Sequence, residues 1–472
     1  MLNAEQIGNE LNRSVKLAMD SGEAPSMKEA QKIFQGYRLG IGLGPDVALS
    51  ATKQAALLTA VNAGRRCFLG GVEVNGCPDA ELLVQWRNCR SLSEAVVDLG
   101  GTLVNKNTPT IPQIVIGDAS VSNDATDFCL RATFDGWRGG VVPINEAIRL
   151  NERHEFTPTG ILCGAIAVSE AFQYVRGSNA FAGRRSFGLS LWEPDSRHSW
   201  LDNSEFGPDL EMLPAKLWLI GLGHLGQAYL WTLGFLPYRD VGAVELVLQD
   251  YDRLVPANDS TSLLTNQSIL GQLKTRAMAQ WCEQRGFRTS LVERRFAPDF
   301  RINADEPQVA LCGVDNKPAR AALEDVGFAQ VIEAGLGKGG EEYLALQIHT
   351  LPGERSARAR WGVQDIGELS DSLYEQPAYQ ALNAAGLDQC GLTLLANRSV
   401  GASFVGAFTA TLVIAELLRM AMGEKRYGVI DGTLRSPESY EYVVNEELST
   451  GPFNPGITQP ADQPSLNKIL AA

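Results

Sequence analysis

The stretch that decides the fold of this chain is Trp218–Trp231, WLIGLGHLGQAYLW. Its apolar start predicts a buried strand, and Gly221, Gly223 and Gly226 follow at the G-x-G-x-x-G spacing as a helical pattern begins. Glycines in this context let the backbone approach a phosphate, whose charge the helix N-terminus stabilises. Such loops most often bind NAD or FAD, so the residues farther along must show which nucleotide this loop holds.

Size and composition indicate a globular protein of several domains. The chain has 472 residues, which predicts about two or three domains, and its net charge of −14 disfavours binding to nucleic acid or to an anionic membrane surface. The N-terminus lacks the apolar core of a signal peptide, so we expect a cytoplasmic protein with reduced thiols. No cysteines are spaced as C-x-x-C, which disfavours a structural zinc site.

One apolar run, GASFVGAFTATLVIAELL (401–418), has the length of a membrane span. It carries hydroxyl side chains and Glu416, and no aromatic belt flanks it. We therefore expect a buried core helix here, and no membrane partner.

The glycine stretch has a faint counterpart earlier in the chain, and four further segments recur in the same order. The pairs are RLGIGLG (38–44) with LWLIGLG (217–223), CFLGGVEV (67–74) with VELVLQDYD (244–252), QIVIGDAS (113–120) with VALCGVDN (309–316), FDGWRGG (134–140) with EAGLGKGG (333–340), and TGILCGAIAVSEAFQ (159–173) with VGAFTATLVIAELLR (405–419). Each pair is weak alone, but the shared order indicates two related halves.

Strands alternate with helical patterns in both halves, which predicts parallel sheets with crossover helices. We therefore predict an α/β fold of two tandem doubly wound, Rossmann-like halves at 1–200 and 201–450. The chain would be a monomer built as a pseudo-dimer, or a homodimer. Residues 451–472 are rich in proline, glycine and polar side chains, which predicts a flexible tail.

Polar residues follow two strands of the second half. LQDYDRLVPAND supplies Asp250, Asp252 and Asn258, and Lys274 comes later in a G-x-x-K setting. The strand ALCGVDN then supplies Asp315. A dehydrogenase needs one acidic residue about 20 residues after the glycines to bind the ribose. This longer series of polar residues argues against an NAD-dependent oxidoreductase.

The glycines, the D-x-D pair, the asparagine six residues beyond it, the lysine and the late aspartate resemble the ThiF and ubiquitin-activating family of adenylating enzymes. The resemblance implies a ThiF-type adenylation fold in the second half. It further implies that Asp250 binds the ribose hydroxyls of ATP, that Asn258 and Lys274 contact the phosphates, and that Asp315 binds Mg²⁺. Asp252 and the three glycines complete the implied nucleotide site.

The reaction that the resemblance implies accounts for these residue types. A carboxylate attacks the α-phosphorus of ATP and expels pyrophosphate, so negative charge builds up on the phosphates. Lys274 and Mg²⁺ offset this charge. Asp315 offers the hard oxygen ligand that Mg²⁺ prefers.

The second half departs from the family at one position. Where the family carries a phosphate-contacting arginine three residues after the asparagine, this chain has Thr261. Related dimers supply an arginine from the N-terminal helix of the partner half, and Arg13 in NELNRSVKLAM lies at a similar distance before the first strand of its own half. The resemblance makes Arg13 a candidate catalytic residue, and the alternative is an ordinary exposed helix arginine.

The first half has GIGLGPDVAL, with Pro45 where the helix begins, and it lacks the D-x-D, asparagine and lysine series. It resembles the degenerate halves of ubiquitin-activating enzymes, in which one half adenylates and its copy supports it. We therefore expect an inactive first half and an active second half.

Cys390 belongs to the segment 355–400 and stands in LDQC, shortly before the long apolar run. The autophagy-type and UFM-type activating enzymes place their acceptor cysteine in this region, and LDQC looks like the autophagy-type segment. A mobile loop would let the thiol reach the adenylate, and proximity makes a small thiolate fraction sufficient. We expect Cys390 to accept the acyl group; a structural or idle cysteine is the alternative.

The resemblance therefore predicts ATP- and Mg²⁺-dependent activation of a ubiquitin-like protein, with thioester formation on Cys390 and transfer to a conjugating enzyme. Compact tandem enzymes of this kind occur in bacterial conjugation systems linked to antiphage defence. Three alternatives stay open: a sulfur-carrier adenylyltransferase of cofactor biosynthesis, a catalytically inactive partner protein and an NAD-dependent oxidoreductase. The missing zinc cysteines disfavour the first, and Thr261 is the best support for the second.

Overall fold

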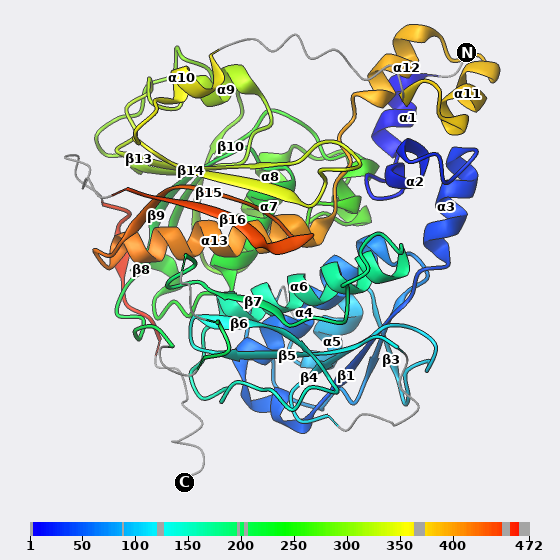
Figure 1. Cartoon of the computed structure of the whole chain (residues 1–472). Coiled ribbons are helices and arrows are strands. Elements are labelled where there is room, and N and C mark those ends of the chain that lie inside the picture. The colour runs from blue at the N-terminus through cyan, green and yellow to red at the C-terminus, as the bar shows by residue number, and fades with distance from the viewer. Residues whose placement is uncertain are drawn as a thin grey trace.

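The computed structural model describes residues 3–86, 89–119, 127–195, 199–202, 206–362, 373–445 and 454–461. In these residues the chain forms two mixed sheets with helices packed against them (Figure 1). The predicted α/β fold class is therefore confirmed.

The first sheet has the strand order β3-β2-β1-β4-β5-β6-β7. Its strands are β1 (Leu39–Leu43), β2 (Val72–Asn75), β3 (Gly101–Val104), β4 (Gln113–Ile116), β5 (Cys129–Asp135), β6 (Arg138–Pro143) and β7 (Phe187–Ser190). The first five strands of this order run parallel to one another, and β6 and β7 are antiparallel additions.

The second sheet has the order β11-β10-β9-β12-β13-β14-β15-β16, which repeats the order of the first sheet and adds one strand. Its strands are β9 (Lys216–Ile220), β10 (Glu245–Gln249), β11 (Arg288–Val292), β12 (Val309–Cys312), β13 (Gln330–Leu336), β14 (Ala345–Leu351), β15 (Arg426–Thr433) and β16 (Ser436–Asn445). Both sheets switch from parallel to antiparallel pairing after the fifth strand in this order.

Each half contributes helices, several of them short. They are α1 (Ala4–Glu10), α2 (Lys16–Asp20), α3 (Met27–Gln35), α4 (Ala51–Cys67), α5 (Leu92–Asp98), α6 (Thr157–Val175), α7 (His224–Gly234), α8 (Lys274–Glu283), α9 (Lys317–Ala321), α10 (Ala357–Trp361), α11 (Pro377–Ala384), α12 (Gln389–Ala396) and α13 (Ser403–Ala421), with 3-10 turns η1 (Pro45–Leu49), η2 (Val241–Ala243), η3 (Pro256–Ser260) and η4 (Gln267–Ile269). Within the described ranges α13 alone is long and apolar enough to cross a membrane, but 94% of its most apolar window is buried inside the protein.

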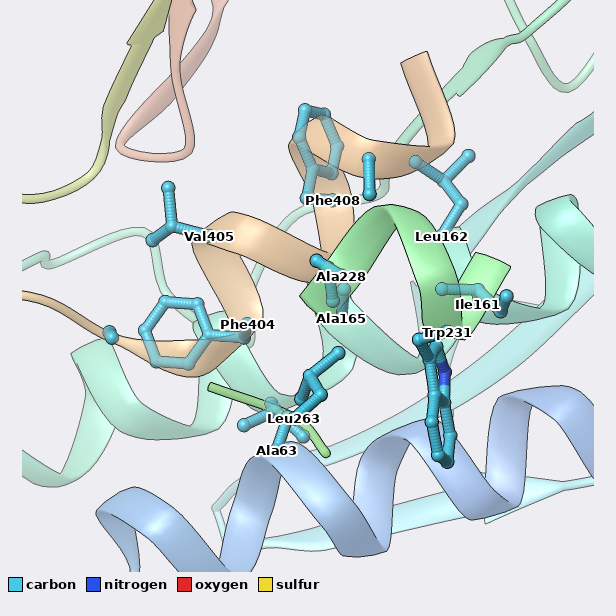
Figure 2. Close-up of a cluster of buried hydrophobic side chains, with 14 of the residues drawn as sticks. Ala63, Ile161, Leu162, Ala165, Ala228, Trp231, Leu263, Phe404, Val405 and Phe408 are labelled. Atoms are coloured by element: carbon cyan, nitrogen blue, oxygen red, sulfur yellow. The ribbon is translucent and has the colours of Figure 1, made fainter. Parts of the chain in front are cut away.

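Four helices, α4, α6, α7 and α13, form the layer between the two sheets (Figure 1). Their apolar side chains interlock, and Figure 2 shows Trp231 of α7 beside Ile161 and Leu162 of α6, with Phe404 and Phe408 of α13 in the same cluster. Apolar side chains of both halves therefore belong to one hydrophobic cluster between the two sheets.

The N-terminal residues pack against the second half of the chain. Helix α1 packs against α12, and the Lys16 ammonium donates to the Ala396 carbonyl at 3.3 Å. The Tyr379 hydroxyl donates to Asp20 at 2.6 Å. The first twenty residues therefore support the cysteine-bearing segment of the second half, although they precede the first half in sequence.

The prediction of a flexible tail is wrong for residues 454–461. There β17 (Ile457–Thr458) pairs antiparallel with β8 (Leu213–Pro214), and the Ala461 amide donates to the Pro237 carbonyl at 2.6 Å. Proline and glycine content gave no sign of this pairing, because the partner strand lies more than 240 residues away in sequence. The rest of the predicted tail lies outside the described residues.

Candidate active site

A cleft of about 450 Å³ lies where β9, β10 and β12 end. Strand β10, which follows β9 in the sequence, lies on one side of β9, and β12 lies on the other side. The cleft therefore occupies the point where the strand order of the sheet reverses direction. The cleft brings together most of the residues that the sequence singled out, namely Arg13, Gly221, Gly223, Asp250, Asp252, Asn258, Thr261, Lys274 and Asp315.

Two of the three motif glycines line this cleft. Gly221 has a φ of +84°, which favours glycine, and a Cβ added to Gly223 would meet nothing within 4 Å. The loop therefore leaves open space at the N-terminus of α7, where a phosphate can approach the backbone. Gly226 corrects the prediction that all three glycines bind the cofactor: its Cβ would lie 2.0 Å from the Gly221 carbonyl oxygen, so this glycine allows close packing inside the loop.

Asp250 is nearly buried and fixed by the backbone around it. Its Oδ2 accepts from the Leu222 amide at 2.7 Å, and its Oδ1 accepts from the amides of Tyr251 and Asp252 at 2.8 and 2.9 Å. The Lys274 ammonium lies 3.0 Å from Asp252 Oδ2 and 3.8 Å from Asp250 Oδ2. Strand β10 and helix α8 thus place the D-x-D pair and the lysine in one cluster beside the glycine loop.

Asn258 lies on η3, and its side-chain oxygen accepts from the Val255 amide at 2.9 Å. The next residue, Asp259, is held by the first half of the chain, because Arg65 and Arg66 of α4 each place a guanidinium nitrogen 2.8 Å from its Oδ1. Burial raises the pKa of Asp259, but these arginines more than offset that effect and keep the pKa below its ordinary value. The first half therefore buttresses the turn that carries Asn258, a role the sequence did not reveal.

Arg13 enters the cleft beside Thr261. A Cβ added to Gly401 would lie 3.0 Å from the Thr261 methyl and 3.9 Å from Arg13 Cβ, so this glycine separates the two residues. The Arg13 amide donates to Ser260 Oγ at 3.0 Å. The residue lies in the turn between α1 and α2, not in a helix as the sequence suggested, and it is not an exposed helix arginine.

The cleft also holds cations that the sequence analysis missed. Arg398 lines it from the connection between α12 and α13. Burial chiefly, and the charge of Arg398 in addition, lower the pKa of Arg13 to about 10. Further cations on the lining are Arg294, Arg295, Arg320 and Lys338. The spacing of arginines in a sequence does not show which of them converge, so no local signal marked this set.

Asp315 is exposed at the end of β12, and its carbonyl accepts from the Lys338 ammonium at 3.5 Å. Across the described parts of the chain there is no group of three or more histidine, cysteine, aspartate or glutamate side chains that would hold a metal ion alone. Mg²⁺ often binds through one carboxylate and the phosphates of a substrate. The single carboxylate of Asp315 fits a metal ion of that kind.

His224 is the first residue of α7, and its ring fills the space between the glycine loop and α13. A Cβ added to Gly406 of α13 would lie 2.4 Å from its Nε2. Burial lowers the pKa of His224 to about 4, so the ring is neutral near pH 7. This histidine is a packing residue that joins the loop to the interior helix.

Cys390 is exposed, whereas the other cysteines are buried or half-buried. It does not lie in a loop as predicted, but is the second residue of α12, whose first turn is capped by Asp388 accepting from the Gly391 amide at 2.8 Å. The capping aspartate and the leucines of α12 favour this helix, whereas Gly391 and Thr393 have poor helix propensity. Cys390 does not line the cleft, so the structure does not bring it together with the glycine loop.

Two family models match: the BilD N-terminal domain at residues 38–191 and the BilD C-terminal domain at residues 213–424. The bacterial E1-like protein BilD of Collimonas sp. (strain OK412) is 43% identical over 449 residues, which covers 95% of this chain and 96% of that protein.

Solved structures resemble the chain only distantly. E. coli MccB aligns with a TM-score of 0.32 and 13% identity over 50% of this chain and 64% of that one. E. coli tRNA N6-threonylcarbamoyladenosine dehydratase, TcdA, aligns with a TM-score of 0.29 and 15% identity over 44% of this chain and 86% of that one. These values add nothing to the fold assignment, whereas the near-complete match to the Collimonas protein decides the family. The chain belongs to the family of the bacterial E1-like protein BilD.

Proposed function

We propose that this protein uses ATP to adenylate the C-terminal carboxylate of a ubiquitin-like protein. The observation that carries the proposal is the union, in one cleft, of an open glycine loop with Asp250, Lys274 and Asn258. Membership in an E1-like family supports the same reading.

Asp250 would hold the ribose. Three backbone amides fix its carboxylate, two of them on Oδ1 and one on Oδ2. A carboxylate oxygen accepts about two hydrogen bonds, so Oδ2 keeps one acceptor position for a ribose hydroxyl. The fixed geometry means that no reorganisation is needed when the nucleotide arrives.

The phosphates would lie between the glycine loop and the cations opposite it. Lys274 and Asn258 would face the triphosphate from α8 and η3, Arg13 would do so from the N-terminal turn, and Asp315 would hold Mg²⁺ together with phosphate oxygens. A new bond forms between the carboxylate oxygen and the α-phosphorus, the bond from that phosphorus to the bridging oxygen breaks, and pyrophosphate leaves. The cations stabilise the charge that accumulates on pyrophosphate.

Cys390 would receive the acyl group next. Its thiolate attacks the acyl carbon, AMP leaves, and a thioester forms that a conjugating enzyme accepts by the same exchange. Because Cys390 lies on α12 outside the cleft, the transfer requires this helix to move relative to the loop. A bacterial antiphage setting and a cytoplasmic location belong to the proposal through the sequence resemblance alone.

The test mixes the protein with ATP, Mg²⁺ and small β-grasp proteins encoded beside its gene. We expect ATP–pyrophosphate exchange that depends on the β-grasp protein, and an adduct on a non-reducing gel that thiols remove. Cys390→Ala should lose the adduct and keep the exchange, while the half-buried Cys77→Ala serves as the matched control. Exchange without any adduct would uphold adenylation and reject the thioester on Cys390. The absence of both the exchange and the adduct would reject the proposed function.

A further inference from the structure

A second pocket, of about 290 Å³, lies at the junction of the two halves. The first half lines it with Leu49 of η1, Leu83 and Glu155, and the second half lines it with residues at the end of α7, among them Phe235 and Leu236. All of its lining residues differ from those of the cleft at the glycine loop of the second half. The pocket is therefore separate from the candidate active site.

Two leucines at this pocket are open to water. Leu49 is 48% exposed and Leu83 is 41% exposed, whereas Phe235 and Leu236 are buried. A single exposed leucine is common on a protein surface, but two at the same apolar pocket form a patch. Covering that patch with another apolar group removes its surface from water, which is favourable.

One carboxylate oxygen of the pocket has no donor. Glu155 Oε2 accepts from the Thr52 amide at 2.8 Å, but Oε1 is buried and accepts no hydrogen bond from the residues that the structure describes. Burying a carboxylate oxygen without a donor is costly, and a cation beside it would offset this cost. The pocket therefore suits apolar side chains that stand next to a lysine or an arginine.

Glu155 corresponds to Gly401 of the second half, because the two residues lie four positions before the repeated segments 159–173 and 405–419. Gly401 lines the cleft in which we place the phosphates of ATP. The first half has a carboxylate at this position and leucines in the same pocket, which disfavours a phosphate and favours an apolar group with a positive charge. The two halves thus offer different chemistry at corresponding places.

The C-terminal strand leads the chain to this pocket. After β17, Pro460 forms a bridge with Tyr238, and the Ala461 amide donates to the Pro237 carbonyl at 2.6 Å. Ala461, Pro237 and Tyr238 all line the pocket. The last residue of this described segment therefore stands at the pocket itself.

The sequence after Ala461 has the chemistry that the pocket requires. Residues 462–472 read DQPSLNKILAA, in which Leu466, Ile469 and Leu470 have the spacing of an apolar helical face and Lys468 stands among them. Leu466 follows Ala461 by five residues, a span of at most about 18 Å. Such a short connection gives a high local concentration, which favours binding within one chain.

We propose that the segment from Leu466 to Leu470 docks in this pocket. Its apolar side chains would cover Leu49 and Leu83, and the Lys468 ammonium would donate to Glu155 Oε1. The docked segment would fasten the C-terminus across both halves of the chain. This contact is independent of the adenylation proposed above, because it uses none of the residues of the cleft.

The test adds a fluorophore-labelled synthetic peptide of residues 462–472 to the full chain and follows its fluorescence anisotropy. In the unchanged protein the chain's own segment competes for the pocket, so the peptide should bind weakly. The double variant Leu466→Ser with Leu470→Ser weakens this competitor. We expect the peptide to bind the double variant at least about 10-fold more tightly than it binds the unchanged protein.

Two substitutions in the pocket show where the peptide binds. Leu83→Asp, added to the double variant, should weaken peptide binding by about 10- to 100-fold, because it places a charge against apolar side chains. Glu155→Gln keeps an acceptor for the Thr52 amide and removes the charge, so it should weaken binding by about 10-fold. A peptide with Lys468→Met should lose no further affinity in the Glu155→Gln variant.

Leu103→Asp is the matched control for Leu83→Asp. Leu103 of β3 is also 41% exposed, and it does not line the pocket. Both leucines are open to water, so neither substitution should prevent folding. Peptide affinity in the double variant should be unchanged by Leu103→Asp.

Equal peptide affinity in the unchanged protein and in the double variant would overturn the proposal, because the chain's own segment would then not occupy the pocket. If Leu83→Asp still weakened binding in that case, the pocket would be a site for a partner peptide of the same chemistry. The absence of peptide binding, or an equal effect of Leu83→Asp and Leu103→Asp, would overturn the proposal as well. ATP–pyrophosphate exchange tests the proposed function separately.

Discussion

The two glycine loops lie at the same place in two sheets of the same strand order, and only one has room for a ligand. In the second half a Cβ on Gly223 would meet nothing within 4 Å. In the first half a Cβ on the equivalent Gly44 would lie 2.2 Å from the Asp118 amide and 2.4 Å from Asp46 Oδ1. That amide donates to the Asp46 carboxylate at 2.7 Å. The chain's own carboxylate thus fills the loop of the first half.

Charges around the filled loop are also neutralised internally. The Lys53 ammonium lies 2.6 Å from Asp46 and 2.9 Å from Glu152, and Arg149 pairs with both Glu152 and Asp118. Although burial alone would lower it, these carboxylates raise the pKa of Lys53 above its ordinary value. The first half therefore keeps its fold with its own carboxylate in the glycine loop, whereas the loop of the second half stays open.

The largest expected effect is on the rate of ATP–pyrophosphate exchange, which should depend on Lys274 of the second half and not on Lys53 of the first half. Lys274→Ala should reduce ATP–pyrophosphate exchange by about 100- to 1,000-fold, because it removes one fixed cation from the charge that builds on the phosphates. Lys53→Met, in the filled loop, should leave the exchange rate per folded molecule unchanged. Steady-state exchange with a saturating β-grasp substrate measures both. An equal loss in the two variants would mean that the first half also acts on ATP.

The next effect concerns the support that the first half gives. Arg66→Ala should lower the free energy of unfolding by about 3 kcal/mol, because it leaves Asp259 and the carbonyls of Leu263 and Thr265 short of a buried donor. Urea denaturation measures the loss. Arg358→Ala, whose ion pair is exposed, should cost less than about 1 kcal/mol. Similar values for the two variants would show that α4 does not buttress the turn.

The stability of the protein should depend on pH through His224, which stands in the glycine loop of the second half where the first half has Pro45. The folded pKa of about 4 lies below the ordinary value of 6.5, so the unfolded chain binds more protons between these values. The free energy of unfolding that the neutral ring contributes is therefore present above pH 6.5 and is lost as the pH falls toward 4, by about 3 kcal/mol. Urea midpoints at pH 7 and pH 4.5 should differ less in His224→Gln than in the unchanged protein. His154→Gln is the control, and an identical change in it would disprove the assignment.

The smallest effect compares the glycines directly. Gly44→Ala should destabilise the protein by about 1 kcal/mol, because the added methyl meets the Asp118 backbone. Gly223→Ala should unfold at the same urea concentration as the unchanged protein, yet bind ATP about 10-fold more weakly, since the methyl occupies the phosphate approach. Denaturation and calorimetry give the two numbers. A destabilised Gly223→Ala would show that the second loop is closed as well.

Sequence patterns predicted what depends on local spacing. The alternation of apolar strands and helical stretches gave the α/β class, and the series from Gly221 to Lys274 gave residues that converge in one cleft. The role of Gly226 was misread, because spacing alone cannot tell a glycine that faces a ligand from one that faces a carbonyl. Arg398, the Arg66–Asp259 pair and the pairing of 454–461 stayed hidden, since each is a contact between residues far apart in sequence.

The ion pairs of Arg65 and Arg66 with Asp259 join the first half to the turn that carries Asn258, so the two halves are constrained to evolve together. In a symmetric pair, each half would need its own site and would brace its neighbour's. If the second half carries the activity proposed above, a mutation in either half affects that one activity, because Arg65 and Arg66 of the first half hold the turn that carries Asn258. A ligand could enter the first glycine loop only if the Asp46 carboxylate left it, and loss of the first half would remove the arginines that hold Asp259. The two halves therefore depend on each other structurally, which favours their remaining in one chain.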